Sequence, residues 1–114
     1  MMEKPHKKLD VWQLAMKSAR MVDDLTRRFP EDEKFGLVSQ MRRAAVSIPS
    51  NIAEGAARQG KAEFRNFLSI AQGSLNELDT QVELALQLDY IKTEQFEALS
   101  EVLIRIGKMI TGLI

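Results

Sequence analysis

Hydrophobic residues within residues 36–55 repeat at the spacing of an α-helix, and the repeat continues across a proline. They are Val38, Met41, Ala45, Ile48 and Ile52, separated alternately by three and four residues. Proline inside a helix removes one hydrogen bond and clashes with the preceding turn, at a cost of about 3 kcal/mol. Because the hydrophobic phase is unbroken across Pro49, the pattern favours one kinked helix over residues 33–58. The alternative is a helix broken at Pro49, with Asn51 and Glu54 forming a second capping box.

Three further segments show the same amphipathic spacing. The first begins at Asp10, which together with Gln13 has the arrangement of a capping box, and it ends before Pro30. The next covers residues 61–89, and the last begins with Thr93 as its cap. Their hydrophobic seams are Ala15, Ala19, Val22 and Leu25; then Phe64, Phe67, Ala71, Leu75, Leu78, Val82 and Ala85; and finally Phe96, Leu99, Leu103, Ile106, Ile110 and Leu113.

These four segments predict an all-α fold. Short connections make consecutive helices antiparallel, so we expect an up-down-up-down four-helix bundle over residues 9–114, with a flexible tail over residues 1–8. The last two helices also carry hydrophobic residues outside their seams, such as Ile70, Leu84 and Ile104. A helix that is apolar on more than one face is buried on more than one face, so we expect the protein to self-associate.

Composition removes several classes of function. The 114 residues fit one domain and contain no cysteine and a single histidine, His6, in the polar N-terminal segment. Disulfides, thiolate or multi-histidine metal sites and serine–histidine chemistry are thereby excluded, and we expect neither enzyme activity nor a bound cofactor or metal. The start of the chain has no apolar core typical of a secretory signal, and no apolar run approaches the roughly 20 residues of a membrane span. We therefore expect a cytoplasmic protein that does not contact the membrane.

The charged residues balance overall but not along the chain. Residues 1–65 contain 13 Lys/Arg and 9 Asp/Glu, whereas residues 66–114 contain 3 and 7, for a net charge of zero. One interpretation is that oppositely charged helices attract each other as antiparallel neighbours. The other is a basic surface that meets phosphate.

Polar residues on the second helix form a continuous stripe beside its hydrophobic seam: Gln40, Arg43, Ser47, Asn51, Glu54 and Arg58. Three interpretations are open. The stripe is a solvated face, or it is a structural hydrogen-bonded network at a helix or subunit interface in which Ser47, Asn51 and Glu54 take part. In the third, Arg42, Arg43 and Arg58 bind a phosphate, because the planar guanidinium donates paired hydrogen bonds to it.

Two more basic residues, Lys61 and Arg65, follow Arg58 closely in sequence and place a basic cluster at one end of the predicted bundle. Such a cluster is a candidate contact for RNA or DNA. No aromatic residue interleaves with it in a way that would stack bases.

The segments LDVWQLAMK, FPEDEKFGLVSQMRRAAVSIPSNIAEGAAR and FLSIAQGSLNELDTQVELALQLDYI resemble the bacterial proteins encoded within intervening sequences of 23S ribosomal RNA genes. The resemblance covers the chain from about Leu9 to the last helix. It implies a four-helix bundle that assembles as a homopentamer with a central channel, and no established enzymatic activity.

A related branch, the accessory variability determinant proteins of diversity-generating retroelements, is similar in fold. Those proteins bind nucleic acid and a reverse transcriptase through a strongly basic barrel. The resemblance therefore implies RNA, DNA or a nucleic-acid-processing protein as a partner, with Arg42, Arg43 and Arg58 as the matching arginines. The present chain departs from that branch in its neutral net charge.

Overall fold

Four long α-helices make up most of the protein. The computed structural model describes residues 4–114, and the elements within them are η1 (Pro5–Lys8), α1 (Asp10–Thr26), η2 (Glu31–Glu33), α2 (Leu37–Ala56), α3 (Lys61–Gln87) and α4 (Thr93–Leu113). The two η elements are short 3-10 helices, and residues 4–114 contain no strand. The predicted all-α fold is confirmed.

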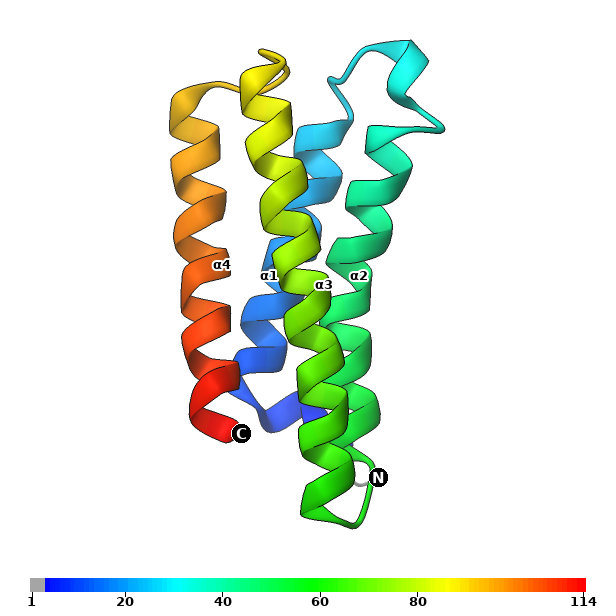
Figure 1. Cartoon of the computed structure of the whole chain (residues 1–114), viewed down its shortest axis with the longest axis vertical. Coiled ribbons are helices and arrows are strands. Elements are labelled where there is room, and N and C mark those ends of the chain that lie inside the picture. The colour runs from blue at the N-terminus through cyan, green and yellow to red at the C-terminus, as the bar shows by residue number, and fades with distance from the viewer. Residues whose placement is uncertain (1–3) are drawn as a thin grey trace.

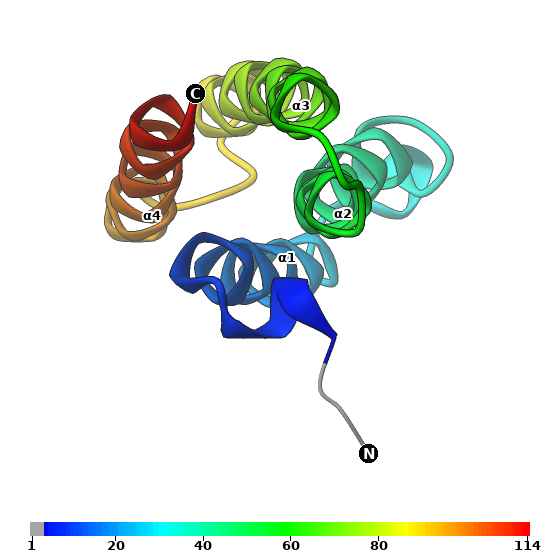
Figure 2. The ribbon, with the colours of Figure 1, turned by 90° about the horizontal axis from the view of Figure 1, so that it is seen from below.

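The four helices pack side by side as an antiparallel bundle (Figures 1 and 2). Each helix contacts its two neighbours, α1 with α2, α2 with α3, α3 with α4, and α4 with α1, and the longest of these interfaces joins α2 to α3. Viewed along the bundle, the helices occupy the corners of an open square (Figure 2). The α2–α3 connection projects beyond the ends of α1 and α4 (Figure 1).

The hydrophobic seam of α2 lies in the core as predicted. Every member of the 3–4 repeat is buried, and so is Pro49. The seam of α3 differs at its start, where Leu68 is fully buried while Phe64 and Phe67 are only partly buried. The first turns of α3 extend past α1 and α4 (Figure 1), so they have fewer neighbours to bury a second aromatic.

The helix α2 runs through Pro49 without interruption, so the alternative of a broken helix is wrong. The side-chain amide of Asn51 donates to the carbonyl oxygen of Ser47 at 2.8 Å, not to a new helix end. The helix begins later than predicted, at Leu37, because residues 31–33 form a separate 3-10 turn and Gly36 has a non-helical backbone (φ −109°, ψ −110°).

Two predicted caps are wrong. Asp10 is the first residue of α1 and caps nothing, while Gln13 donates its amide to the carbonyl oxygen of Lys7 at 3.0 Å. Likewise Thr93 is the first residue of α4, and the backbone N–H of Lys92 donates to Oε1 of Gln95 at 2.9 Å. In both cases the turn before the helix brings a backbone group within reach of a glutamine in its first turns. The glutamine side chain, and not the predicted cap, therefore forms the hydrogen bond at the N-terminus of the helix.

The N-terminal segment packs against the bundle over part of its length. Pro5–Lys8 form η1, which contacts α1 and α2, and the rings of His6 and Trp12 meet edge to face with centroids 4.9 Å apart. Residues 1–3 of the predicted flexible tail lie outside the described residues. The flexibility of the segment stays a prediction.

Candidate functional site

Charge is separated along the length of the bundle. We divide the described residues at the midpoints of the four helices and call residues 4–17, 48–73 and 103–114 the basic end. The basic end contains nine Lys/Arg and three Asp/Glu, whereas residues 18–47 and 74–102, the acidic end, contain seven and twelve. The nine basic residues are Lys4, Lys7, Lys8, Lys17, Arg58, Lys61, Arg65, Arg105 and Lys108. The net charge of zero therefore conceals a molecule with one positive and one negative end.

The candidate residues Arg58, Lys61 and Arg65 lie together at the tip of the basic end, around the α2–α3 connection. Arg58 is held in place: its Nη2 lies 3.1 Å from Glu54 Oε2, its Nε lies 3.9 Å from Glu63 Oε2, and its guanidinium lies 5.1 Å from the centre of the Phe67 ring. Lys61 and Arg65 are exposed, and their side chains form no ion pair within residues 4–114. Both are therefore available to an external anion.

A shallow pocket of about 290 Å³ lies beside this tip, between η1 and the α2–α3 connection. Leu9, Gly55 and Phe64 give it an apolar floor, and Arg58 and Lys61 stand at its edge. The floor exists because α2 and α3 approach closely at Gly55, where a Cβ atom would lie 2.9 Å from the side chains of both neighbouring phenylalanines.

The other two candidate arginines lie elsewhere and differ from each other. Arg42 bridges α2 to α1: its Nε donates to Oγ1 of Thr26 at 2.9 Å and lies 3.6 Å from Oδ1 of Asp23. Arg43 is exposed, and within the described residues its side chain forms no hydrogen bond or ion pair. Arg58 follows Arg42 by 16 residues and lies just beyond the end of α2, about 24 Å away at the rise of an α-helix. A single phosphate site made by all three arginines is therefore not present within one subunit.

The middle of the polar stripe joins α2 to α3. The hydroxyl oxygens of Ser47 and Ser74 lie 2.7 Å apart, and Asn51 donates its amide to Oγ of Ser47 at 3.0 Å. Glu54 instead faces outward to Arg58. The stripe thus divides into a hydrogen-bonded centre between two helices and charged members at the surface.

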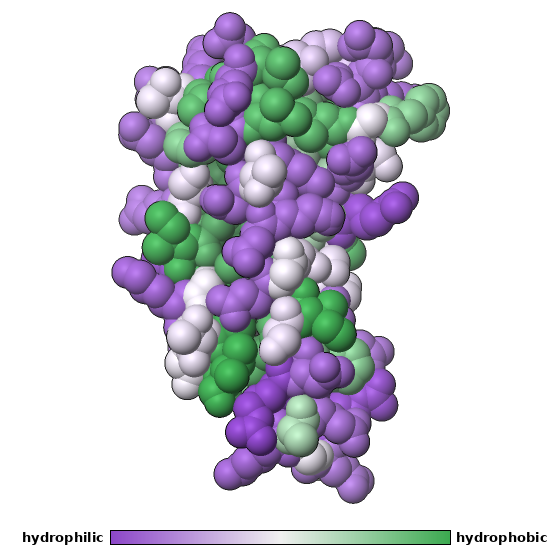
Figure 3. Space-filling model, in the orientation of Figure 1, coloured by the Kyte–Doolittle hydropathy of each residue, from purple (hydrophilic) through white to green (hydrophobic). Residues whose placement is uncertain are grey.

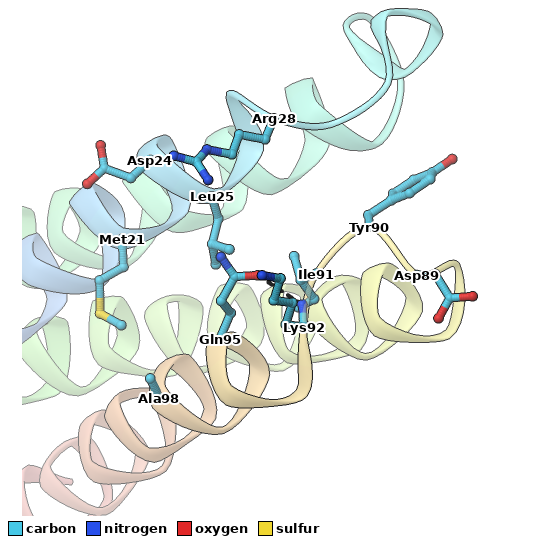
Figure 4. A pocket seen from close by; sticks show the side chains of 10 residues that line it. All are labelled: Met21, Asp24, Leu25, Arg28, Asp89, Tyr90, Ile91, Lys92, Gln95 and Ala98. Atoms are coloured by element: carbon cyan, nitrogen blue, oxygen red, sulfur yellow. Dashed lines mark hydrogen bonds between the residues drawn. The ribbon is translucent and has the colours of Figure 1, made fainter.

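A larger groove at the acidic end was not predicted. It has a volume of about 560 Å³ and lies between the end of α1 and the start of α4 (Figure 4). Its residues come from segments far apart in the sequence: Met21, Asp24, Leu25, Arg28, Asp89, Tyr90, Ile91, Lys92, Gln95 and Ala98. No local sequence signal marks it, because only the packing of α1 against α4 brings these segments together.

Tyr90 connects this groove to the loop before α2. Its ring packs against Phe29 with centroids 5.2 Å apart, and its hydroxyl donates to Oε2 of Glu33 at 2.8 Å. The hydrogen bond to Glu33 raises the pKa of Tyr90, because ionisation of the phenol would remove the donor and place two negative charges together. Asp89 precedes it with φ of 60°, a left-handed conformation that aspartate tolerates and that ends α3.

Within residues 4–114, no group of three or more histidine, cysteine, aspartate or glutamate side chains is placed to hold a metal ion. No helix in the same part of the chain combines the length and apolarity that crossing a membrane requires.

Comparisons with known proteins agree with the fold. A protein of unknown function from the S23 ribosomal protein family of Bacteroides thetaiotaomicron VPI-5482 has a similar crystal structure, with a TM-score of 0.83 and 30% sequence identity over 91% of this chain and 97% of the other. No curated protein matches the chain significantly. The family described as 23S rRNA-intervening sequence protein matches residues 7–112. The chain therefore belongs to the 23S rRNA-intervening sequence protein family.

Proposed function

We propose that the protein is a non-enzymatic, cytoplasmic homo-oligomer, a pentamer as the family resemblance implies, whose basic end binds RNA or DNA. The observation that carries this proposal is the excess of nine basic over three acidic residues at one end of a neutral molecule. Local potential, not net charge, governs the attraction of a phosphate backbone. The neutral composition is therefore no obstacle.

Lys61 and Arg65 are the proposed primary contacts. They occupy the first two turns of α3, where unpaired backbone N–H groups and the helix dipole add positive potential to the two side chains. Arg58 supports them, although Glu54 and Glu63 already neutralise part of its charge. Oligomerisation strengthens binding through these weak contacts. Once one basic end has bound a nucleic acid, the other basic ends of the same oligomer meet that molecule at a high effective concentration.

Exposed hydrophobic residues support the proposed self-association. Ile70 and Leu84 on α3, Leu88 just after it and Ile104 on α4 are each at least 45% exposed. Figure 3 shows separate hydrophobic patches on the face formed by these two helices. Apolar surface beyond what a monomer normally exposes marks sites of association.

Binding of structured RNA and of duplex DNA at two salt concentrations tests the function. We expect affinity to fall steeply with salt, with a slope of about 0.9 per phosphate contact on B-form DNA. The double variant Lys61→Gln/Arg65→Gln should bind more weakly and show a shallower slope. The matched control is Arg20→Gln/Lys34→Gln, which removes the same charge from the acidic end and should bind as the unmodified protein does.

The two outcomes that contradict the proposal are distinct. If neither nucleic acid binds at low salt while the protein remains oligomeric, the protein is a protein-interaction assembly without nucleic-acid binding, which is the alternative function. If both double variants weaken binding equally, net charge is responsible and the basic end is not the site.

A further inference from the structure

The pocket of about 290 Å³ at the basic end, which we call the tip pocket, differs in charge from the larger groove between α1 and α4. The charged residues that line the tip pocket are Arg58 and Lys61, and no acidic residue lines it within the described part of the chain. The larger groove is lined by Asp24 and Asp89 as well as by two basic residues. A ligand with negative charge therefore suits the tip pocket better than the groove.

The floor of the tip pocket contains an aromatic side chain, Phe64, which is only partly buried. The other large apolar residues of the lining, Pro5 and Leu9, come from the N-terminal segment. Only the packing of η1 against α2 brings that segment to the α2–α3 connection. The charge pattern along the sequence indicates no aromatic residue able to stack a base here, whereas the fold places Phe64 beside the basic rim.

Two exposed cations flank Phe64 on α3. Lys61, Phe64 and Arg65 share one face of the first two turns of this helix, because residues three and four apart are neighbours on a helix surface. Proteins that bind single strands of nucleic acid combine a basic track for the phosphates with aromatic side chains on which the bases stack. The start of α3 presents both elements within one helical face.

Arg58 adds a planar group in a fixed position at the edge of the tip pocket. Its guanidinium lies 5.1 Å from the centre of the Phe67 ring, and its Nη2 lies 3.1 Å from Glu54 Oε2. Guanidinium planes stack on unpaired bases as aromatic rings do. Gln59 also lines the pocket, and its amide forms no side-chain hydrogen bond among residues 4–114. That amide can therefore donate to and accept from the edge of a base.

The size and position of the tip pocket limit what it can hold. Its volume of about 290 Å³ lies at the lower limit of pockets for small-molecule ligands, about 300–1,000 Å³, so it suits one ring system and little more. The α2–α3 connection projects beyond the ends of α1 and α4 (Figure 1), so a long strand can reach the pocket without meeting the rest of the bundle.

We propose that the tip pocket binds one unpaired nucleotide of an RNA or DNA strand, with the base against Phe64 and the adjoining phosphates on Lys61 and Arg65. This inference rests on the proposed function and specifies its ligand. The cations of the basic end attract any phosphate backbone, and the pocket adds a preference for strands with an unpaired base. A base inside a duplex is paired and stacked, so it enters such a pocket only after it has been extruded.

Two matched probes test the preference. One is a short duplex with a single-stranded tail, and the other is the same duplex with a tail of sugars and phosphates that lacks bases. Because their charges are equal, any difference in affinity comes from the bases. The unmodified protein should bind the first probe about tenfold more tightly, within the range for stacking of a base on an aromatic side chain. This ratio should persist at higher salt, where both affinities fall.

The ratio is measured with RNA probes and with DNA probes, and a preference for the tail with bases in either set supports the proposal. Phe64→Leu keeps an apolar side chain but removes the aromatic face, so it should bind both probes as the unmodified protein binds the probe without bases. The matched control is Phe35→Leu, which removes a phenylalanine that is 90% exposed at the acidic end and should retain the tenfold ratio.

A second variant obstructs the tip pocket and leaves Phe64 in place. Ala56 is a partly buried residue of the lining at the end of α2, and Ala56→Leu fills the pocket with additional apolar volume. It should lose the tenfold ratio, and it tests the proposal independently if Phe64→Leu does not fold. Circular dichroism establishes that each variant retains the helical content of the unmodified protein.

The contrary results separate this inference from the proposed function. If no probe binds at low salt, both fail together. If the two probes bind equally while Lys61→Gln/Arg65→Gln still weakens binding, the proposed function stands and the pocket for a base is overturned. If folded Phe64→Leu or folded Ala56→Leu retains the tenfold ratio, the base binds elsewhere and the assignment to the tip pocket is overturned.

Discussion

Arg42 donates a hydrogen bond from Nε to the buried hydroxyl of Thr26, 2.9 Å away across the interface of α1 and α2. The Thr26 hydroxyl itself donates a hydrogen bond to the carbonyl oxygen of Val22 at 2.8 Å, so it both donates and accepts. The adjacent Arg43 faces solvent instead. Two neighbouring arginines on one helix therefore have different roles, one between helices and one at the surface.

This difference predicts unequal effects on stability. Arg42→Ala removes one charge-assisted hydrogen bond and should lower the free energy of unfolding by about 1 kcal/mol. Arg43→Ala removes no hydrogen bond or ion pair seen in the described residues and should change the free energy of unfolding by less than about 0.5 kcal/mol. Urea denaturation followed by circular dichroism measures both. Equal effects of the two substitutions would contradict the structural assignment.

The close approach of α2 and α3 at Gly55 predicts that adding a single methyl group there lowers the stability of the protein. In Gly55→Ala the new Cβ would lie 2.9 Å from Cδ1 of Phe64 and from Cβ of Phe67. Forcing these groups apart should destabilise the protein by about 1–3 kcal/mol. The matched control is Gly73→Ala, inside α3, where nothing lies within 4 Å of the new Cβ and alanine should stabilise the helix by about 1 kcal/mol. Thermal unfolding of both variants checks the prediction, which fails if they shift the midpoint in the same direction.

The hydrogen bond between Ser47 and Ser74 predicts energetic coupling of α2 and α3. A double-mutant cycle with Ser47→Ala and Ser74→Ala should show a coupling free energy of about 0.5–1.5 kcal/mol, because each single variant leaves a partly buried hydroxyl or amide without its partner. Additive effects on the free energy of unfolding would show that the bond contributes nothing.

We expect the hydrogen bond between Tyr90 and Glu33 to make the free energy of unfolding depend on pH in alkaline solution. The hydrogen bond to Glu33 requires the protonated phenol, so the folded-state pKa of Tyr90 is raised above the ordinary 10.0. The stabilisation is therefore fully present below about pH 10 and is lost as pH rises through the folded-state pKa. Tyr90 is the only tyrosine, so the ultraviolet absorbance of tyrosinate reports its titration alone.

Glu33→Gln should move that titration back toward the ordinary pKa, because it removes the negative charge that opposes ionisation. Glu97→Gln, a carboxylate on α4 that is absent from the causes of the shift, serves as the control and should leave the titration in place. A tyrosine that titrates at its ordinary value in the unmodified protein would contradict the hydrogen bond.

The sequence by itself determined which helices form and which face of each is buried. The 3–4 spacing of Val38, Met41, Ala45, Ile48 and Ile52 is sufficient because helical geometry puts residues at that spacing on one stripe, and burying the stripe is the dominant favourable term. The same reason accounts for the uninterrupted α2, since the stripe has to remain in register across Pro49.

Tertiary packing decided the rest, because the relevant contacts join residues far apart in the chain. The polar stripe identified the residues of α2 but could not show that Ser47 meets Ser74 or that Arg42 meets Thr26. Counting charges in the two halves of the sequence did not reveal that the bundle has a basic and an acidic end. The reason is that antiparallel helices bring segments from both halves of the chain to each end. The position of Phe35 beside solvent, and the groove between α1 and α4 at the same end of the bundle, likewise exist only once the four helices are packed.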